Sequence, residues 1–328
     1  MKAHHRIIAL LLALCLLPLT GCARAAAQKQ SVVGFYLDTV ITLTAYVDDV
    51  SILEDALAEC GRYERLLSRT LEGSDVWRIN HAGGAAVPVS RDTLDILAVA
   101  KQVSVSSGGA FDATIAPVST LWDFTSGAKV LPDADTLAEA AGRVDYTRVQ
   151  IADGEVALPE GMMIDLGGIA KGYIADAVKE YLIDRGVTSD ILSFGGNIVA
   201  IGLKPDGSAW KVGIQDIDAP TGAYMLVARN TGGSTVTSGI YERGFELDGI
   251  YYHHILDPRT GWPVQNELAS VTIFSESSMW GDALATAAFA LGQEAGMALI
   301  ESLDGIEAVF IARDRTVTYS SGARAYML

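Results

Sequence analysis

A glycine-rich segment that carries an acid and a lysine is the first part of this sequence that could do chemistry. It runs Asp165-Leu166-Gly167-Gly168-Ile169-Ala170-Lys171 and leads from an apolar stretch into a predicted helix. Adjacent glycines at a helix entrance expose backbone N–H groups, and the N-terminal end of a helix favours anions. The segment lacks the spacing of the Walker and dinucleotide-binding motifs. It fits either a phosphate site that uses Asp165 and Lys171 or an ordinary turn with a surface lysine.

A carboxylate and a hydroxyl lie one helical turn apart near the C-terminus. Asp282 and Thr286 are four residues apart in a predicted helix, so their side-chain oxygens share one face. Such hard oxygen donors suit Mg²⁺ better than zinc. The alternative is that Asp282 only complements the helix dipole, while Thr286 bonds to the backbone of its own helix.

A long irregular segment over residues 110–127 combines an acid with aromatic residues. It contains Ala110-Phe111-Asp112 and, further on, Trp122 and Phe124. Loops of this length inside a compact domain tend to be functional, and aromatic faces beside a carboxylate suit the binding of a flat ring. The same composition also fits a compact loop whose aromatic side chains seal the core.

Two adjacent histidines follow the segment Thr237-Ser238-Gly239 and a predicted hairpin. Successive residues of a strand point to opposite faces, so at most one of His253 and His254 can join a given site. His254 is a candidate acid, base or phosphate ligand. For either residue, the alternative is a strand histidine that simply bonds to a turn carbonyl.

Helices and strands alternate irregularly around these segments. Residue spacing predicts one strand over 33–47, a polar loop over 68–84 and helices over 51–67, 92–106, 135–141, 171–185, 279–291 and 294–302. The rest of the chain after residue 186 is largely strand-like, and several strands look antiparallel. This order predicts a mixed α/β or α+β enzyme rather than a doubly wound sheet.

Composition limits the possible classes of function. The chain has 328 residues, of which 50% are hydrophobic and 20% charged, so a sizeable core is expected and bulk disorder is not. Its formal net charge of −16 disfavours nucleic acid as a partner. Cys60 is the one cysteine expected in the folded part, and it is predicted to be a buried helical residue, so neither a disulfide nor a thiolate zinc site is expected.

The N-terminus is predicted to be an export signal that ends in a lipidation site. A short basic head precedes the apolar run Ile7–Leu17, which is too short to span a bilayer comfortably. Leu19-Thr20-Gly21-Cys22 then resembles a bacterial lipobox, with acylation at Cys22. An ordinary cleavage site with an incidental cysteine is the alternative. The expected organisation is a signal peptide over 1–21, a lipid-anchored tether over 22–31 and a catalytic domain over 32–328.

In this order, the segments resemble the ApbE flavin transferase family, the FAD:protein FMN transferases. The resemblance covers essentially the whole mature chain. One departure is Leu37-Asp38-Thr39, where family members often have Met-Gly-Thr, so the flavin contact there differs in detail. The segments that carry the resemblance are Phe35 to Thr39, Gly109 to Asp112, Asp165 to Lys171, Phe194 to Asn197, Thr237 to Gly239, His254 to Gly261 and Asp282 to Thr286.

The resemblance implies a two-lobed fold with the site in the cleft. It implies that Mg²⁺ is held by the Asp282 carboxylate, the Thr286 hydroxyl and the main-chain oxygen of Ala170. It also implies an FAD site lined by Leu37, Ala110, Phe111, Asp112, Asp165, Lys171, Ser238, His254 and Ile255.

The implied reaction cleaves FAD, attaches FMN through a phosphoester to a Thr or Ser of an acceptor protein, and releases AMP. Asp282 and His254 are the two candidates for accepting the hydroxyl proton. The implied partners are FAD and exported or membrane flavoprotein subunits, and the lipid anchor would place the enzyme on the extracytoplasmic face of a bacterial membrane. Two alternatives remain open: a Mg²⁺-dependent FAD pyrophosphatase that yields FMN and AMP, and a non-catalytic FAD-binding lipoprotein.

Overall fold

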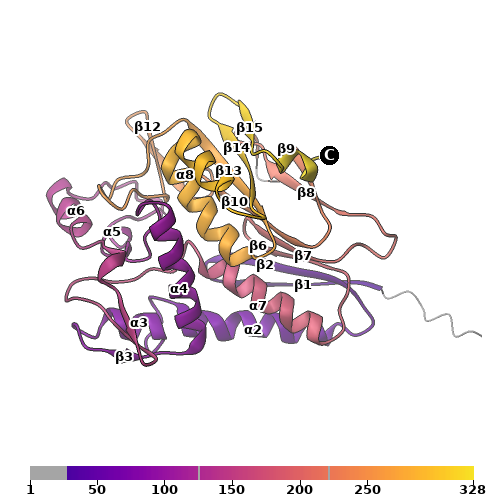
Figure 1. The fold of residues 1–328 in the computed structure, drawn as a ribbon, viewed down its shortest axis with the longest axis horizontal. Coiled ribbons are helices and arrows are strands. Elements are labelled where there is room, and N and C mark those ends of the chain that lie inside the picture. The colour runs from indigo at the N-terminus through magenta and orange to yellow at the C-terminus, as the bar shows by residue number, and fades with distance from the viewer. Residues whose placement is uncertain (1–27, 125, 221) are drawn as a thin grey trace, which may run out of the picture.

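The computed structural model describes residues 28–124, 126–220 and 222–328 (Figure 1). One eight-stranded sheet forms its centre, and all its neighbouring strands pair antiparallel. Helices pack on it, which confirms the predicted mixed α/β class. In spatial order, its strands are β1 (Gln28–Tyr36), β2 (Thr39–Val47), β6 (Asp190–Phe194), β7 (Asn197–Ile201), β10 (Gly233–Gly239), β13 (Leu268–Ser275), β14 (Glu307–Ala312) and β15 (Val317–Tyr319).

The principal helices contact one face of this sheet, and a small sheet packs against the other. Helix α2 contacts β1 and β2, α7 contacts β6 and β7, and α8 contacts β10 and β13. A hydrophobic cluster on the opposite face joins β8 (Trp210–Gln215) and β9 (Tyr224–Asn230) to the sheet. The helices are α2 (Ser51–Leu67), α3 (Asp75–Asn80), α4 (Arg91–Ser106), α5 (Ala116–Ser119), α6 (Ala134–Ala141), α7 (Ala170–Asp184) and α8 (Ser278–Glu301), with short 3₁₀ turns η1 (Tyr146–Arg148) and η2 (Ala323–Tyr326).

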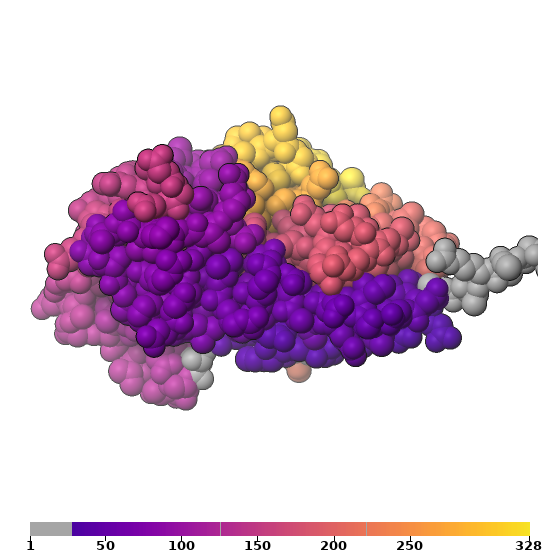
Figure 2. All heavy atoms as spheres, turned by 90° about the horizontal axis from the view of Figure 1, so that it is seen from below, coloured from indigo at the N-terminus to yellow at the C-terminus, as the bar shows by residue number. Residues whose placement is uncertain are grey.

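A second, smaller part of the molecule is built from the segments between α2 and α7. Its residues, purple to magenta in Figure 2, gather at one end of the molecule. Its α5–α6 region has a separate hydrophobic cluster around Trp122, Leu137 and Phe245, whereas the buried side chains of α3 and α4 belong to the main core. It includes the short sheet of β3 (Val87–Pro88), β5 (Glu155–Ala157) and β4 (Gln150–Ala152), while the hairpin of β11 (Gly244–Leu247) and β12 (Ile250–His253) contributes to the cluster.

Helix α8 is the central helix of the main core. By length and apolar composition it could cross a membrane. However, more than half of its apolar stretch is buried inside the protein, as expected for a core helix. Gly292 has φ of 80°, a left-handed conformation that breaks the helix into two parts. This break confirms the two helices predicted over 279–291 and 294–302. Cys60 is buried in α2, also as predicted.

Three sequence-based expectations need correction. The single strand predicted over 33–47 is a hairpin of β1 and β2, because Leu37 and Asp38 take left-handed φ values of 56° and 55° and reverse the chain. The usual glycine signal for such a turn is missing. Residues 28–31, expected to be tether, pair in β1, and the polar loop over 68–84 contains α3. Cys22 and the rest of the predicted leader and anchor lie outside the described residues.

A buried carboxylate stands at the start of β6. Asp190 is fully buried, and among the described residues its oxygens have only weak contacts with the backbone N–H groups of Ile191 and Thr44, with no hydrogen bond of good geometry. It lies between Ala45 of β2 and Ile201 of β7. Burial disfavours the charged form and raises the pKa of Asp190 to about 8.

Because this folded-state pKa lies above the value in the unfolded chain, Asp190 makes the protein less stable as pH rises from 4 towards 8. Asp190→Asn removes the titration. We expect its advantage over the parent in the free energy of unfolding to grow by about 4 kcal/mol between pH 5 and pH 8. Urea unfolding at both pH values measures this difference. The same advantage at both pH values would contradict the assignment.

Candidate functional site

The N-terminal ends of α7 and α8 meet in close contact. A methyl group on Gly172 of α7 would lie 2.2 Å from the carbonyl oxygen of Ser278 in α8, so only glycine permits this approach. The two helices run antiparallel here, because Gly172 contacts Asp282 while Asp176 contacts Ser278. The glycine-rich segment and the Asp282–Thr286 segment, which are more than 100 residues apart in sequence, are therefore neighbours.

The carboxylate of Asp282 is the polar centre of this contact. Its side chain is only 3% exposed, and the Lys171 ammonium lies 3.2 Å from Oδ1 and 3.4 Å from Oδ2. The backbone N–H of Gly172 donates to Oδ2 at 3.0 Å. Lys171 also donates to the carbonyl of Gly167 at 3.2 Å. A buried carboxylate is thus matched by a full positive charge and by a helix N-terminus.

Thr286 lies one turn further along α8 and faces the same loop. Its hydroxyl is 3.4 Å from that of Ser238 at the end of β10. A methyl group on Gly168 would lie 3.6 Å from the Thr286 hydroxyl and 3.2 Å from the ring of Phe111. The structure therefore brings Phe111, Gly168, Ser238 and Thr286 together, although four separate segments supply them.

Asp165 holds the glycine-rich turn by a hydrogen bond and forms an ion pair with Arg69. Its Oδ1 accepts the N–H of Gly167 at 2.9 Å, and its Oδ2 accepts the Ser119 hydroxyl at 2.8 Å. Arg69 forms an ion pair with the same carboxylate at 3.2 Å. Sequence reasoning missed Arg69, because it lies in the loop after α2 with no motif around it.

Asp112 holds its own loop in shape. Its Oδ1 accepts the N–H and the hydroxyl of Thr114, both at 2.7 Å, and its Oδ2 accepts the N–H of Tyr146 at 2.9 Å. Burial raises the pKa of this carboxyl, and these hydrogen bonds partly offset the effect. Asp112 and Phe111 are both buried, and the hydrogen bonds of Asp112 hold the loop that carries the Phe111 ring.

The aromatic residues further along the same segment pack against one another. The indole N–H of Trp122 donates to the carbonyl of Gly261 at 2.9 Å, and its ring stacks on Phe124 with centroids 5.3 Å apart. Trp122 also contacts the rings of Tyr252 and Trp262. For Trp122 and Phe124, the structure favours the alternative in which aromatic residues seal a core.

The two histidines have different surroundings, as strand alternation predicts. His253 is fully buried, with Nε2 2.9 Å from the carbonyl of Val264 and Nδ1 accepting the N–H of Ile255 at 3.3 Å, so both of its nitrogens are occupied. His254 donates from Nδ1 to the carbonyl of Arg243 at 3.2 Å. Burial lowers the pKa of each to about 4, and the nearby positive charge of Lys171 adds to the effect at His254. His254 is therefore neutral at pH 7.

Residues after Ser238 connect the histidine to the predicted flavin contact at Leu37. Arg243 accepts the His254 hydrogen bond at its carbonyl and donates from Nη2 to the carbonyl of Asp38 at 3.0 Å. The N–H of Leu37 is held by Glu64 of α2 at 2.8 Å. Arg243 and Glu64 were not predicted, since their role depends on contacts that are distant in sequence.

The oxygen donors near Asp282 fit a hard divalent cation. Within the described ranges, no group of three or more His, Cys, Asp or Glu side chains could hold a metal, so such a site must combine one carboxylate with other oxygens. Asp282 and Thr286 offer a carboxylate and a hydroxyl, and Ala170 begins the adjoining helix. The Lys171 ammonium beside Asp282 indicates that this position attracts positive charge.

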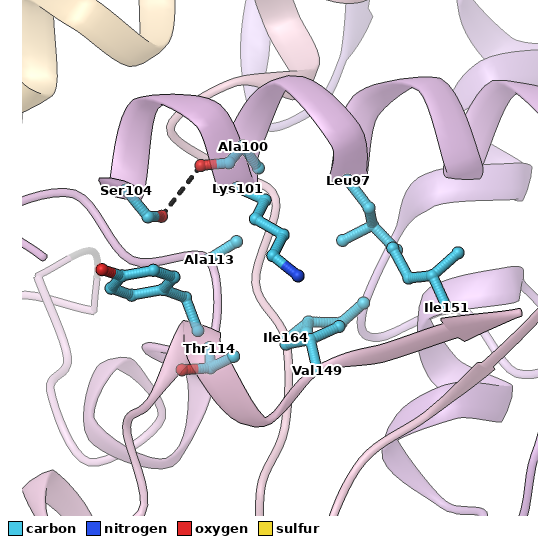
Figure 3. Close-up of a pocket in the computed structure, with 10 residues that line it drawn as sticks. Leu97, Ala100, Lys101, Ser104, Ala113, Thr114, Val149, Ile151 and Ile164 are labelled. Atoms are coloured by element: carbon cyan, nitrogen blue, oxygen red, sulfur yellow. Dashed lines mark hydrogen bonds between the residues drawn. The ribbon is translucent and has the colours of Figure 1, made fainter. Parts of the chain in front are cut away.

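Two shallow pockets are lined by other residues. The one in Figure 3 lies between α4 and the strand β4, and its lining is mainly apolar, with Lys101 as its charged group. Ala113 and Thr114 line it from the back of the Asp112 loop. The second is lined by residues around Asn80 and Gly161. Neither contains a residue of the predicted site, so the chemistry of Lys171 and Asp282 identifies the site better than cavity shape does.

Known proteins resemble this chain over most of its length. A Klebsiella pneumoniae protein named FAD:protein FMN transferase is 38% identical over 295 residues, which cover 87% of this chain and 89% of the relative. A Treponema pallidum protein of the same name is 38% identical over 287 residues, with 82% and 79% covered.

Solved structures share the fold. The ApbE protein of Thermotoga maritima superposes with a TM-score of 0.85 at 29% identity and covers 92% of this chain and 100% of its own. The flavinyl transferase ApbE of Pseudomonas stutzeri, in its apo form, gives 0.81 at 29% identity, covering 93% and 98%. The family model described as ApbE family matches residues 37–310. This chain therefore belongs to the ApbE family.

Proposed function

We propose that this enzyme cleaves FAD with the help of Mg²⁺ and attaches the FMN half to a Thr or Ser of an acceptor protein, with AMP as the leaving group. The observation that carries the proposal is the meeting of Lys171 and Gly172 with Asp282 at the joined ends of two helices. The names of the relatives, FAD:protein FMN transferase, support a flavin nucleotide as substrate and a protein as acceptor.

The chain's own groups suit a pyrophosphate. The molecule is acidic overall, with a net charge of −16, so an anionic substrate needs local positive charge. Lys171 supplies an ammonium, and Arg69 supplies a guanidinium that pairs with Asp165. The N-terminal end of α7 adds a positive dipole end. When FAD arrives, its phosphates would compete with Asp282 for Lys171.

A divalent cation would bind to the Asp282 carboxylate, the Thr286 hydroxyl and the main-chain oxygen of Ala170. Bound there, it would neutralise charge on the pyrophosphate and stabilise the departing AMP. We assign the walls of the FAD site to Leu37, Ala110, Phe111, Asp165, Ser238 and Ile255, with Asp112 holding the Phe111 loop.

The acceptor hydroxyl must lose a proton as its oxygen attacks the FMN-side phosphorus. His254 suits this role, because it is neutral and its Nδ1 is held by Arg243, which leaves Nε2 as the basic atom. Asp282 is engaged with Lys171 and Gly172, which favours His254 over Asp282 as the proton acceptor. If water replaced the protein hydroxyl, the same residues would hydrolyse FAD to FMN and AMP.

Mass spectrometry of an exported flavoprotein domain after incubation with enzyme, FAD and Mg²⁺ tests this function. We expect an added FMN on a Thr or Ser of that domain. Asp282→Asn should lower the rate at least a hundredfold, because the site loses its buried charge. Asp95→Asn, which alters an acid paired with Arg91 at the surface of α4, serves as the control. AMP release without modified acceptor would favour hydrolysis, and unchanged transfer by Asp282→Asn would refute the metal-centred site.

His254→Gln tests the proton acceptor. We expect transfer to fall about a hundredfold or more, because proton removal by a positioned base contributes that much. In the parent protein, the rate should be lost only as pH falls through about 4, where His254 becomes protonated. Rates measured from pH 4 to 8 give the profile. Loss of rate in the parent already near pH 6.5, with no such loss in His254→Gln, would contradict the buried surroundings assigned to His254.

We further propose that Cys22 carries lipid and anchors the enzyme to the extracytoplasmic face of a bacterial membrane, near exported or membrane flavoprotein subunits. The support is the sequence Leu19-Thr20-Gly21-Cys22 after an apolar run.

Cys22→Ser should move the protein from the membrane fraction to the soluble fraction of a bacterium that processes lipoproteins. Immunoblots of the separated fractions measure the shift, and the parent protein is the control. The proposal fails if the variant remains with the membranes to the same extent.

A further inference from the structure

Helices α7 and α8 cap each other through two equivalent hydrogen-bond sets. Asp282 of α8 accepts the backbone N–H of Gly172 near the start of α7. Asp176 of α7 accepts the backbone N–H of Ser278 at the start of α8 at 2.8 Å. In each helix, the capped residue lies four positions before the capping acid. The two acids therefore occupy equivalent places in an antiparallel pair, which we call the reciprocal cap.

Asp176 makes more contacts with α8 than this one bond. Its Oδ2 also accepts the N–H of Met279 at 3.0 Å and the hydroxyl of Ser277 at 2.7 Å. The first N–H groups of a helix have no partner inside the helix, so three donors converge on one carboxylate that belongs to another helix. These bonds fix the start of α8 against α7.

The position of Asp282 depends on this arrangement. Asp282 lies one turn after Ser278, and the contact between the helices is tight because Gly172 has no side chain. If the start of α8 moved, Asp282 and Thr286 would move with it, away from Lys171 and Gly172. The bonds of Asp176, which lie outside the site, thus hold Asp282 in its place inside the site.

We infer that Asp176 is a positioning residue for the active site, which sets the distance of Asp282 and Thr286 from Lys171 without touching the substrate itself. The inference rests on the proposed function of Asp282 and Thr286 as cation ligands. Asp176 belongs to no motif singled out in the sequence, where it looks like an ordinary polar residue of a helix.

The chain offers a matched control in Asp75. This acid of α3 caps the start of α4, because it accepts the N–H of Ser90 at 2.8 Å and the hydroxyl of Thr93 at 2.7 Å. Asp75→Asn therefore weakens an inter-helix cap of the same kind away from the site. A merely structural role of Asp176 would give the two Asn variants the same behaviour.

The test compares Asp176→Asn and Asp176→Ala with Asp75→Asn in two measurements. The first is hydrogen exchange of the peptide that contains the Gly172 amide, in the protein without ligand. The second is the Mg²⁺ concentration that gives half-maximal quenching of FAD fluorescence. We expect Asp176→Asn to raise Gly172 exchange at least tenfold and the Mg²⁺ requirement at least fivefold, with larger effects for Ala. All three variants should melt at lower temperature, but Asp75→Asn should change neither measurement by more than twofold.

Ser277→Ala, which removes one bond to Asp176 and the cap bond from the N–H of Trp280, serves if the Asp176 variants do not fold, and it should shift both measurements in the same direction. The inference is overturned if Gly172 exchange in the Asp176 variants matches that of Asp75→Asn, or if exchange rises while the Mg²⁺ requirement stays unchanged. If the parent protein itself does not bind FAD with Mg²⁺, the proposed function fails, and Gly172 exchange alone then decides whether Asp176 positions Asp282.

Discussion

A buried charged group must be matched by an opposite charge or by hydrogen bonds, and the site depends on how this chain meets that requirement at Asp282. Removing a charge from water is costly unless an opposite charge or good hydrogen bonds replace the lost hydration. Here Lys171 and the amide of Gly172 do so, and both belong to a helix that begins more than 100 residues earlier. The same balance makes the position responsive to an anionic substrate, which would compete for Lys171, and to a cation, which would compete for Asp282.

The rest of the fold positions these groups. The β1–β2 turn, the turn between β6 and β7 and the end of β10 lie at the same end of the sheet, because neighbouring strands run antiparallel. Leu37, Ser238 and Arg243 lie at that end of the sheet. Arg243 links the β1–β2 turn to His254. Helix α8 begins near the opposite end of these strands, beside Ser234 and Ser275, and runs back towards Ser238, which Thr286 reaches.

Residue patterns along the chain predicted most of the helices and the strand-rich second half. They could not predict contacts between segments that are distant in sequence. The helices over 51–67 and 92–106 follow from regular spacing, and the strand-rich second half follows from alternation and turns. The hairpin at Leu37 was missed because its turn has no glycine.

Among site residues, Lys171, Asp282 and Thr286 were candidates from their types and spacing, with an ordinary structural role as the alternative, and the structure places Lys171 beside Asp282. Arg69, Arg243 and Asp176 were not, since nothing near each of them in sequence marks its partner. For Trp122 and Phe124 the sequence left two roles open, and only their stacked packing decided between them.

The most direct test of the central claim is a crystal structure of the protein with FAD and Mn²⁺, in which anomalous scattering locates the cation. We expect one cation bonded to oxygens of Asp282 and Thr286, with the FAD pyrophosphate beside it and Lys171 turned from Asp282 towards a phosphate. A cation or pyrophosphate bound elsewhere, with the Lys171–Asp282 ion pair still intact, would contradict the claim.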